Sequence, residues 1–461
     1  MLTRRKLLGN TLMCSAGLAL ARNAYGFADV DAKLTLRLSK VEPVQVPANF
    51  TGLGYEMSSV APLGLLSASN HRYVELIKGL GPEGVLRVGG IVANYTRYEP
   101  NGTIIAERQN TVITRASLGQ FCGFLKKTGW RTIWSVNFAQ SSIQDAVEEA
   151  RAVAHVLGPR LLALEVGNEV DGYENDYETY RTEYNEWYAA IVKAVPGMPF
   201  AAPDTAVNVE WVERMAEDAA GDVQLLTTHY YRTGQDHGSF EQLLQPDPRL
   251  MDTLVRLHAA SRRSGIPWRM CETNSFSGGG LRGVSDTFIG ALWTLDYMLL
   301  LAEYGCSGVN IETGVNQLGF ISPYSPIQDD GKGANSAGIP YYGMLAFAVA
   351  RRGCTEARVV DVPEPAGNIT AYALGTAGNV HSVVIVNRGV NDVRISVENL
   401  SLDRRLTAMR LLAPSGNSTT GVTFAGASVE ASGKWSPAHI ERVIDSDVAL
   451  PRMSAVVLRN S

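Results

Sequence analysis

Residues 161–169 read LLALEVGNE, an apolar run of strand length that ends in Gly-Asn-Glu. Short apolar or β-branched runs bounded by Gly, Pro, Asn or Asp are typical of buried strands. Seven more lie at 50–57, 84–90, 132–138, 199–205, 222–231, 267–274 and 308–313. Between these runs lie amphipathic, helix-like segments such as 112–128, 143–156, 176–194, 208–219, 250–263 and 285–304. The alternation predicts an α/β fold, a (β/α)8 TIM barrel over 50–351, with an open doubly wound sheet as the alternative.

The sequence pattern changes at about residue 352. Short alternating runs such as TAYALG, SVVIVNR and SAVVLRN are separated by Gly, Asn, Pro and Asp, which is typical of an antiparallel β-sandwich. The total of 461 residues also exceeds what one hydrophobic core usually supports. We therefore expect a C-terminal β-sandwich domain over 352–461. The alternating segment KLTLRLS within 29–49 is expected to add an N-terminal strand to that sandwich.

Residues 1–28 have the pattern of an export signal. Arg4, Arg5 and Lys6 precede a short Ala/Leu-rich run, and the sequence Gly-Phe-Ala offers a cleavage site after Ala28. The paired arginines resemble a twin-arginine signal. An uncleaved anchor helix is the alternative, although the run is shorter than the ~20 residues that a membrane span needs. We expect an exported protein, periplasmic or secreted, with no stable membrane insertion after signal removal.

The charge and cysteine content exclude several classes of function. Without residues 1–28, 37 Lys and Arg face 46 Asp and Glu, a net charge of −9, so a nucleic-acid partner is not expected. Cys14 leaves with the signal, and we expect Cys122, Cys271, Cys306 and Cys354 to be buried free thiols, with a single disulfide as the alternative. No Cys-x-x-Cys or His-Glu-x-x-His spacing occurs, so neither a metal nor a cofactor is expected.

Two glutamates end predicted barrel strands. Glu169 closes the fourth predicted strand and Glu272 the seventh, and strand ends of this kind face the open mouth of a barrel. Cleavage of a glycosidic bond needs one carboxylic acid that protonates the leaving oxygen and a second carboxylate on the opposite side of the anomeric carbon. The pair therefore predicts a glycoside hydrolase acting on a carbohydrate substrate. A non-catalytic glycan-binding barrel is the alternative from another class.

The segments around these glutamates resemble a known family. Asn168-Glu169 is similar to the acid/base signature of clan A glycoside hydrolases. The run from Glu272 through Thr-Asn-Ser-Phe-Ser to Gly278-Gly-Gly, continuing into Ser285-Asp-Thr-Phe, resembles the nucleophile segment of glycoside hydrolase family 79, which includes heparanases and β-glucuronidases. The family combines a barrel with a β-sandwich built from both chain ends. The resemblance implies Glu169 as general acid/base, Glu272 as nucleophile and Asn168 as a contact to the sugar 2-hydroxyl.

The resemblance also implies further contacts to the substrate. Tyr230 matches the tyrosine that hydrogen-bonds the nucleophile, and a slip of one residue would select Tyr231 instead. Glu56 matches an acidic contact to sugar hydroxyls. The amides of Gly278 and Gly279 and the hydroxyl of Tyr324 would surround the uronate carboxylate.

One position departs from the family pattern. Ser277 stands where the family usually has a tyrosine, and it could still donate a hydrogen bond to a substrate carboxylate. Glu312, at the end of the eighth predicted strand, adds a negative charge that suits an anionic sugar poorly. The expected function is a retaining exo-β-glucuronidase that acts through a covalent glycosyl-enzyme on chain ends or small glucuronides. A methylated uronic acid or a neutral sugar is the alternative substrate.

Overall fold

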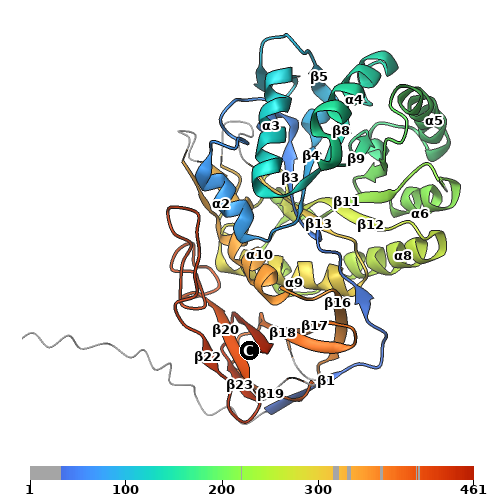
Figure 1. Cartoon of the computed structure of the whole chain (residues 1–461). Coiled ribbons are helices and arrows are strands. Elements are labelled where there is room, and N and C mark those ends of the chain that lie inside the picture. Colours follow the sequence, from blue (N-terminus) through green and yellow to red (C-terminus); the bar gives the residue numbers. More distant parts are fainter. Residues whose placement is uncertain are drawn as a thin grey trace, which may run out of the picture.

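The computed structural model describes residues 33–219, 221–314, 321–329, 334–363, 367–400, 402 and 405–460. The predicted export signal, with Cys14, lies outside them. Eight parallel strands form a closed barrel (Figure 1). In chain order they are β3 (Thr51–Glu56), β4 (Val85–Gly89), β8 (Arg131–Val136), β9 (Leu161–Val166), β10 (Phe200–Thr205), β11 (Leu225–Gly234), β12 (Trp268–Ser277) and β13 (Val309–Glu312). β13 pairs with β3 and closes the ring, so the predicted barrel is confirmed and the open sheet is wrong.

The interior of the barrel is packed rather than hollow. One apolar cluster takes a residue from each of six strands, namely Val85, Ile133, Ala163, Ala201, Leu225 and Cys271. At the N-terminal end of the strands, the buried guanidinium of Arg269 donates to Asn310 Oδ1 at 2.6 Å and to the carbonyl of Phe50 at 3.2 Å. These groups close that end of the barrel, which leaves the C-terminal end for a site.

Helices surround the barrel, and two of them have a second partner. The helices are α1 (Met57–Val60), α2 (His71–Gly79), α3 (Arg115–Thr128), α4 (Ile143–Leu157), α5 (Tyr177–Ala194), α6 (Val209–Asp218), α7 (Phe240–Leu244), α8 (Pro248–Ser264), α9 (Phe288–Glu303) and α10 (Ile339–Ala350). α9 and α10 are apolar on nearly every side because they lie between the barrel and the C-terminal sheet (Figure 1). Among the described residues, no helix is long and apolar enough to cross a membrane.

The C-terminal strands form a second unit that also takes in the start of the described chain. Its strands are β1 (Lys33–Leu38), β2 (Val44–Gln45), β16 (Glu356–Asp361), β17 (Ile369–Thr376), β18 (Asn379–Asn387), β19 (Val393–Asn399), β20 (Leu406–Leu412), β21 (Thr423–Phe424), β22 (Glu441–Arg442), β23 (Asp447–Leu450) and β24 (Ser454–Asn460). β1 pairs antiparallel with β16 and parallel with β19. One face of these strands is buried in its own cluster, which includes Leu36, Val383 and Val456. This cluster is the core of the second unit.

A buried ion pair joins the two units. Asp296 of α9 lies 3.1 Å from the guanidinium of Arg388, which follows β18, and accepts a hydrogen bond from the hydroxyl of Tyr372 in β17 at 2.9 Å. Two small sheets complete the structure, one of β5 (Thr96–Tyr98), β6 (Ile105–Glu107) and β7 (Asn110–Ile113), the other of β14 (Ile327–Asp329) and β15 (Asn335–Ala337). Cys122, Cys271, Cys306 and Cys354 are buried free thiols, as predicted.

Glu149 is a buried carboxyl of α4 that predicts a pH-dependent stability. It accepts a hydrogen bond from Trp134 Nε1 at 2.7 Å, and burial raises the pKa of its carboxyl to about 7 despite that bond. Because the folded state holds this proton more tightly, the wild type loses stability as the pH rises from about 4.5 to about 7. Glu149→Gln keeps the acceptor and cannot ionise. We expect it to raise the free energy of unfolding near neutral pH by up to about 3 kcal/mol, with little gain below pH ~4.

Chemical denaturation at several pH values measures this difference. Glu148→Gln is the matched control, because Glu148 precedes Glu149 on the same helix and is exposed. A gain from Glu149→Gln that stays constant across the pH range would contradict the buried-carboxyl interpretation.

Candidate active site

Four glutamates gather at the C-terminal end of the barrel strands. Glu56 ends β3, Glu272 lies in β12 and Glu312 ends β13, while Glu169 follows β9 by three residues. Glu169 has a left-handed backbone, with φ 51°, at the turn that leaves its strand. A non-glycine residue in this conformation is uncommon and is often found at functional sites.

The carboxylates of Glu169 and Glu272 face each other. One carboxylate oxygen of each, together with a ring nitrogen of His229, lies within 4.8 Å of the others. Retaining glycosidases place two carboxyl groups ~5–5.5 Å apart, whereas inverting enzymes separate them further to admit a water molecule. The spacing therefore fits direct attack by a carboxylate on a sugar held between the pair.

Two neighbours orient Glu272. Arg87 Nη1 donates to its Oε2 at 2.8 Å, and the hydroxyl of Tyr231 donates to its Oε1 at 2.9 Å. Each oxygen thus has one fixed donor, and the side chain retains 12% exposure toward the mouth of the barrel. A partly exposed carboxylate that is held at both oxygens is well placed to act as a nucleophile.

The tyrosine assigned to the nucleophile must be corrected from Tyr230 to Tyr231. The hydroxyl of Tyr230 points elsewhere and donates to Asp247 Oδ2 at 2.7 Å. Adjacent residues of a strand face opposite sides, so only one of the two tyrosines can reach into the barrel. The register between β11 and β12 shifts just before this point: Thr228 lies beside Met270 while His229 lies beside Glu272.

Arg87 of β4 is fully buried beneath Glu169 and Glu272, and it contacts several polar side chains. Besides Glu272, its guanidinium donates to Glu165 Oε2 at 2.8 Å and to Asn168 Oδ1 at 2.7 Å, and it forms an ion pair with Asp204. A buried guanidinium with several carboxylate partners carries the charge that allows those acids to be buried. The arginine thereby fixes the floor of the site.

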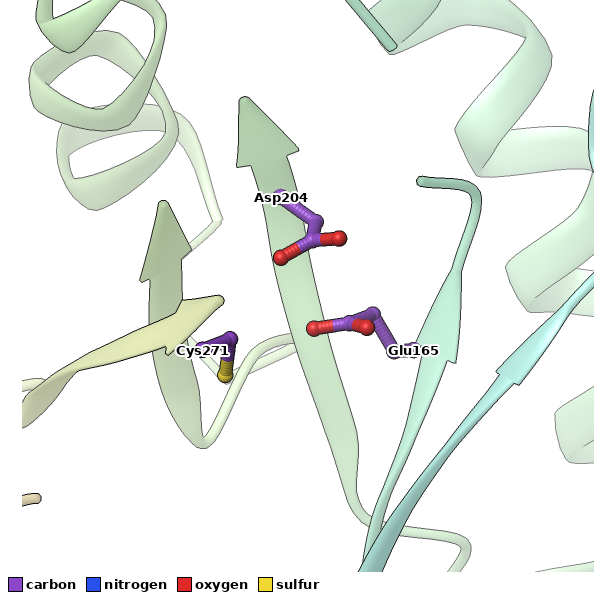
Figure 2. Close-up of side chains that lie close together, drawn as sticks. All are labelled: Glu165, Asp204 and Cys271. Atoms are coloured by element: carbon purple, nitrogen blue, oxygen red, sulfur yellow. The ribbon is translucent and has the colours of Figure 1, made fainter. Parts of the chain in front are cut away.

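Figure 2 shows Glu165, Asp204 and Cys271 close together in this floor. Glu165 and Asp204 come from the adjacent strands β9 and β10, and Cys271 comes from β12, beyond β11. One ligand-type atom from each lies within 4.8 Å of the others, an arrangement that a metal ion could use. However, Arg87 already pairs with both carboxylates. Burial also raises the pKa of the Cys271 thiol well above its usual range, so it stays a thiol rather than a thiolate ligand. Glu165 and Asp204 are therefore better described as the buried ion-pair partners of Arg87.

His229 of β11 connects the floor to Glu169. Its Nδ1 lies 3.2 Å from Glu169 Oε1 and its Nε2 lies 3.0 Å from Asp204 Oδ1. Burial opposes a charge on the imidazole, but Asp204 and Glu272 outweigh it and raise the pKa of His229 well above the ordinary value. Burial likewise favours a neutral Glu169, but its hydrogen bond to His229 outweighs that effect and lowers the pKa of the carboxyl. The proton of this hydrogen bond therefore lies on His229 Nδ1, and Glu169 is ionised.

Asn168 and Glu56 offer polar groups for a ligand. The side-chain nitrogen of Asn168 is buried and has no hydrogen-bond partner among the residues that the structure describes. Glu56 accepts from the amide of Val92 at 2.9 Å, while burial and the charge of Glu272 raise the pKa of its carboxyl to about 8. At neutral pH Glu56 is therefore largely protonated and can donate to a sugar oxygen. Gly90 makes room for it, since a Cβ there would clash with Glu56 Oε2.

The glycines after β12 form a tight loop against Tyr324. Gly278, Gly279 and Gly280 all have positive φ angles, between 78° and 99°, which other residues adopt poorly. A Cβ on Gly280 would lie 2.8 Å from that of Tyr324, whose amide donates to the carbonyl of Gly279 at 3.3 Å. The side chain of Gln235, oriented to satisfy its hydrogen bonds, donates to the carbonyl of Gly278 at 3.0 Å. The loop is therefore held in place from two sides.

Tyr324 lies beside Tyr231, whereas Ser277 makes no comparable contact. The ring of Tyr324 stacks on that of Tyr231, with centroids 6.4 Å apart. Burial and the charges of Glu312 and Glu272 raise the pKa of the Tyr324 hydroxyl, which stays protonated as a donor. Ser277 ends β12 beside Gly234, and its side chain has no hydrogen bond to a residue within the described ranges.

Sequence reasoning brought the two glutamates together but did not identify Arg87, Asp204 or His229. The one signal for Arg87 was a charged residue inside the apolar run GVLRVGG, which only a buried partner can explain. Asp204 follows a proline at the end of β10, and His229 lies inside β11. Their partners come from other strands, so spacing along the chain gives no signal for the contacts.

No family model matches the chain. It is 25% identical over 357 residues to a β-glucuronidase of Aspergillus niger, covering 67% of this chain and 64% of that protein. It is 23% identical over 420 residues to a hyaluronoglucuronidase of Hirudo nipponia, covering 77% of this chain and 83% of that protein. The chain thus spans less than two thirds of the Aspergillus relative. These relatives confirm the resemblance to β-glucuronidases seen in the sequence.

A solved structure shares the fold across nearly the whole chain. It is a 4-O-α-L-rhamnosyl-β-D-glucuronidase from Fusarium oxysporum, with a TM-score of 0.74 and 17% identity, covering 92% of this chain and all of that one. At that identity the match supports the barrel with its C-terminal β domain, and the assignment of chemistry depends on the site itself.

Proposed function

We propose that the chain is a retaining β-glucuronidase that releases β-linked glucuronic acid from the ends of glycans or from small glycosides. The observation that carries the proposal is the facing pair of Glu169 and Glu272, within 4.8 Å at the mouth of the barrel. Each carboxylate has partners suited to a different role. Glu272 is fixed by Arg87 and Tyr231 for attack, and Glu169 is joined to His229, which holds a proton.

In the first step Glu272 attacks the anomeric carbon and the glycosidic bond breaks. The proton on His229 Nδ1 passes to Glu169 and on to the leaving oxygen, which departs as an alcohol. The product is a glycosyl ester of Glu272. The amide nitrogen of Asn168, buried and without a partner among the described residues, is free to donate to the 2-hydroxyl of the sugar.

In the second step water replaces the alcohol. Glu169, now an anion, takes a proton from the water molecule, whose oxygen attacks the anomeric carbon and displaces Glu272. Two inversions at one carbon retain the β configuration. The proton then passes from Glu169 back to His229 Nδ1, which restores the starting state.

Glu169→Ala tests the acid/base role. With an aryl β-glucuronide whose leaving group needs no acid, we expect kcat to fall by about 10²–10⁴-fold, because the glycosyl-enzyme lacks its base. Azide needs no base, so it should restore turnover and yield β-glucuronosyl azide, identified by NMR. Glu186→Ala, at an exposed position of α5, is the control and should show neither the loss nor the azide product. An α-configured azide would exclude the retaining mechanism.

Recognition of the uronate carboxylate is assigned to Tyr324 and to the glycine loop. The Tyr324 hydroxyl stays protonated, and Glu56, largely protonated at neutral pH, adds a second donor near the same pocket. A neutral donor can bind a substrate carboxylate beside other acids without the cost of a buried cation. The pocket can therefore accept an anion although it contains several glutamates.

Tyr324→Phe removes one of these donors while keeping the ring. We expect KM for an aryl β-glucuronide to rise about 10- to 100-fold, the value of a hydrogen bond to a charged group. Turnover of the matching β-glucoside should not change. Tyr230→Phe is the matched control, because that hydroxyl donates to Asp247 rather than to the site. An equal loss on both sugars would show that Tyr324 supports the pocket without reading the carboxylate.

A methylated uronic acid or a neutral sugar is the second candidate substrate. Ser277 in place of the family's tyrosine favours it, and so does the negative charge of Glu312, whose carboxylate lies against Gly54 of β3. Initial rates on aryl β-glucuronide, its methyl ester and aryl β-glucoside separate these candidates. Fastest turnover of the glucoside would refute the glucuronidase proposal.

We further propose that the protein is exported, on the strength of residues 1–28.

A further inference from the structure

A groove lies between α2, α10 and the C-terminal β domain, away from the four glutamates. It encloses about 570 Å³, within the range of ligand-binding clefts. Lys78 and Gly79 at the end of α2 form one wall, and residues 433–437 with Ile440 form another. The chain leads from Gly79 into the first residue of β4, so the groove lies toward the N-terminal end of the barrel strands. The active site is at the other end.

The groove is basic in a chain whose net charge is −5. Lys78, Arg352 and Lys434 line it and are exposed, and none has a salt bridge to a described residue. Arg459 adds a fourth cation at the edge, where it donates to the carbonyl of Val349 at 2.6 Å. Glu75 is the one acidic residue that lines the groove within the described chain. The groove therefore favours an anionic ligand.

Apolar groups form the floor between these cations. Leu345 and Val349 of α10 and Met409 of β20 are buried there. Trp435 is half-buried and stacks on Phe424, with centroids 5.1 Å apart, which fixes its ring in the wall. A rigid aromatic ring beside aliphatic side chains provides a surface for the apolar faces of sugar rings, which a purely electrostatic patch lacks.

The basic surface continues past Ile440. A second hollow of about 320 Å³ shares that residue and is lined by Arg405 and Arg442. Glu441, which also lines it, is already paired with Arg410 at 2.7 Å. The two hollows meet at Ile440, so that Arg405 and Arg442 add to the cations of the groove, which suits an extended polyanion better than a single small anion.

We propose that this groove is a second carbohydrate site that binds a chain containing uronic acids. The choice of saccharide rests on the proposed function, because a polymer that ends in glucuronic acid carries the carboxylates that the lysines and arginines would meet. Binding at the far end of the barrel would hold such a polymer on the enzyme between successive cleavages of chain ends.

The test measures binding of hyaluronan hexasaccharide by calorimetry at low salt, with Glu272→Gln protein so that no turnover occurs. Lys78→Ser/Lys434→Ser removes two cations of the groove. Lys193→Ser/Arg262→Ser removes two exposed cations from α5 and α8, on the opposite side of the barrel from α2 (Figure 1). We expect the first pair to weaken binding about tenfold or more and the second to leave it unchanged.

Aryl β-glucuronide hydrolysis, measured with Glu272 restored, distinguishes this proposal from the proposed function. We expect equal rates for the wild type and both double variants, because the lysines do not contact the catalytic pair. Equal hexasaccharide binding by the two double variants would overturn the groove proposal while leaving the glucuronidase proposal intact. So would binding of cellohexaose as tight as that of hyaluronan, or tighter lysine-dependent binding of single-stranded DNA or phosphatidylglycerol vesicles. If the wild type does not hydrolyse the aryl β-glucuronide, the proposed function is refuted instead.

Discussion

Glu272→Gln is expected to lower kcat/KM on an aryl β-glucuronide on the order of 10⁴-fold or more, because an amide cannot form the glycosyl ester. The fold should persist. Glutamine keeps an oxygen that can accept from Arg87 Nη1, and the hydroxyl of Tyr231 can turn from donating to Glu272 to accepting from the new amide. The melting temperature should therefore remain close to that of the wild type. Steady-state rates and thermal unfolding measure the two quantities.

The matched control for this change is Glu149→Gln, which replaces a buried glutamate of α4 and should retain full activity. Mass spectrometry after incubation with a 2-fluoro-glucuronyl fluoride provides a direct test. Fluoride leaves the anomeric carbon, and the sugar remains bonded to the nucleophile. A label on a peptide that lacks Glu272 would contradict its assignment.

Arg87→Met is expected to lower the free energy of unfolding by about 3–5 kcal/mol at neutral pH, because it leaves buried carboxylates without their cation. Those acids are Glu165, Asp204 and Glu272. Burial favours a neutral Asp204, but the charges of Arg87 and His229 outweigh it and hold the pKa of this carboxyl at about 2. Without the guanidinium this pKa rises in the folded state, so the loss grows as the pH rises above the ordinary carboxyl pKa of about 4. As the pH falls toward 2, Asp204 becomes neutral with or without the arginine, and most of the deficit should disappear. Activity should also fall, since Glu272 loses one of its two fixed donors.

Arg269→Met is the matched control for that experiment. Arg269 is also fully buried in the barrel, but its guanidinium donates to Asn310 and to backbone carbonyls such as that of Phe50, which do not titrate. Its loss should cost stability by an amount that does not vary with pH, and the catalytic end of the barrel should be unaffected. A pH-independent deficit in Arg87→Met would show that the acids around it are not held charged by the arginine.

The architecture was accessible from the sequence because each barrel strand is a separate apolar run. All eight predicted runs overlap observed strands, and Glu169 and Glu272 could be placed at the barrel mouth by their positions at strand ends. The second unit was accessible because short alternating runs follow the apolar stretch that forms α10, and a separate antiparallel sheet is what such runs predict. A local sequence pattern is enough to place a residue whose position depends only on the strand that contains it.

The contacts within the site were less accessible. The choice between Tyr230 and Tyr231 depends on which side chain of β11 points into the barrel. Because the register against β12 shifts just before these residues, counting alternate residues along the strand does not predict which one it is. The links from Arg87 to Asp204 and from His229 to Glu169 join strands that are far apart in the chain. Such pairs are set by the three-dimensional arrangement of the barrel. A single sequence contains the residues but not their partners.

The position of β1 has a consequence for the order of folding. Arg37 of β1 lies beside Asp361 of β16, and the whole barrel lies between these two residues along the chain. Closing so long a loop carries a large entropic cost, which is more easily met once the intervening segment is compact. We therefore expect the barrel to form first and β1 to be captured late, so that the β domain acquires its full protection against hydrogen exchange only after the catalytic end is already assembled.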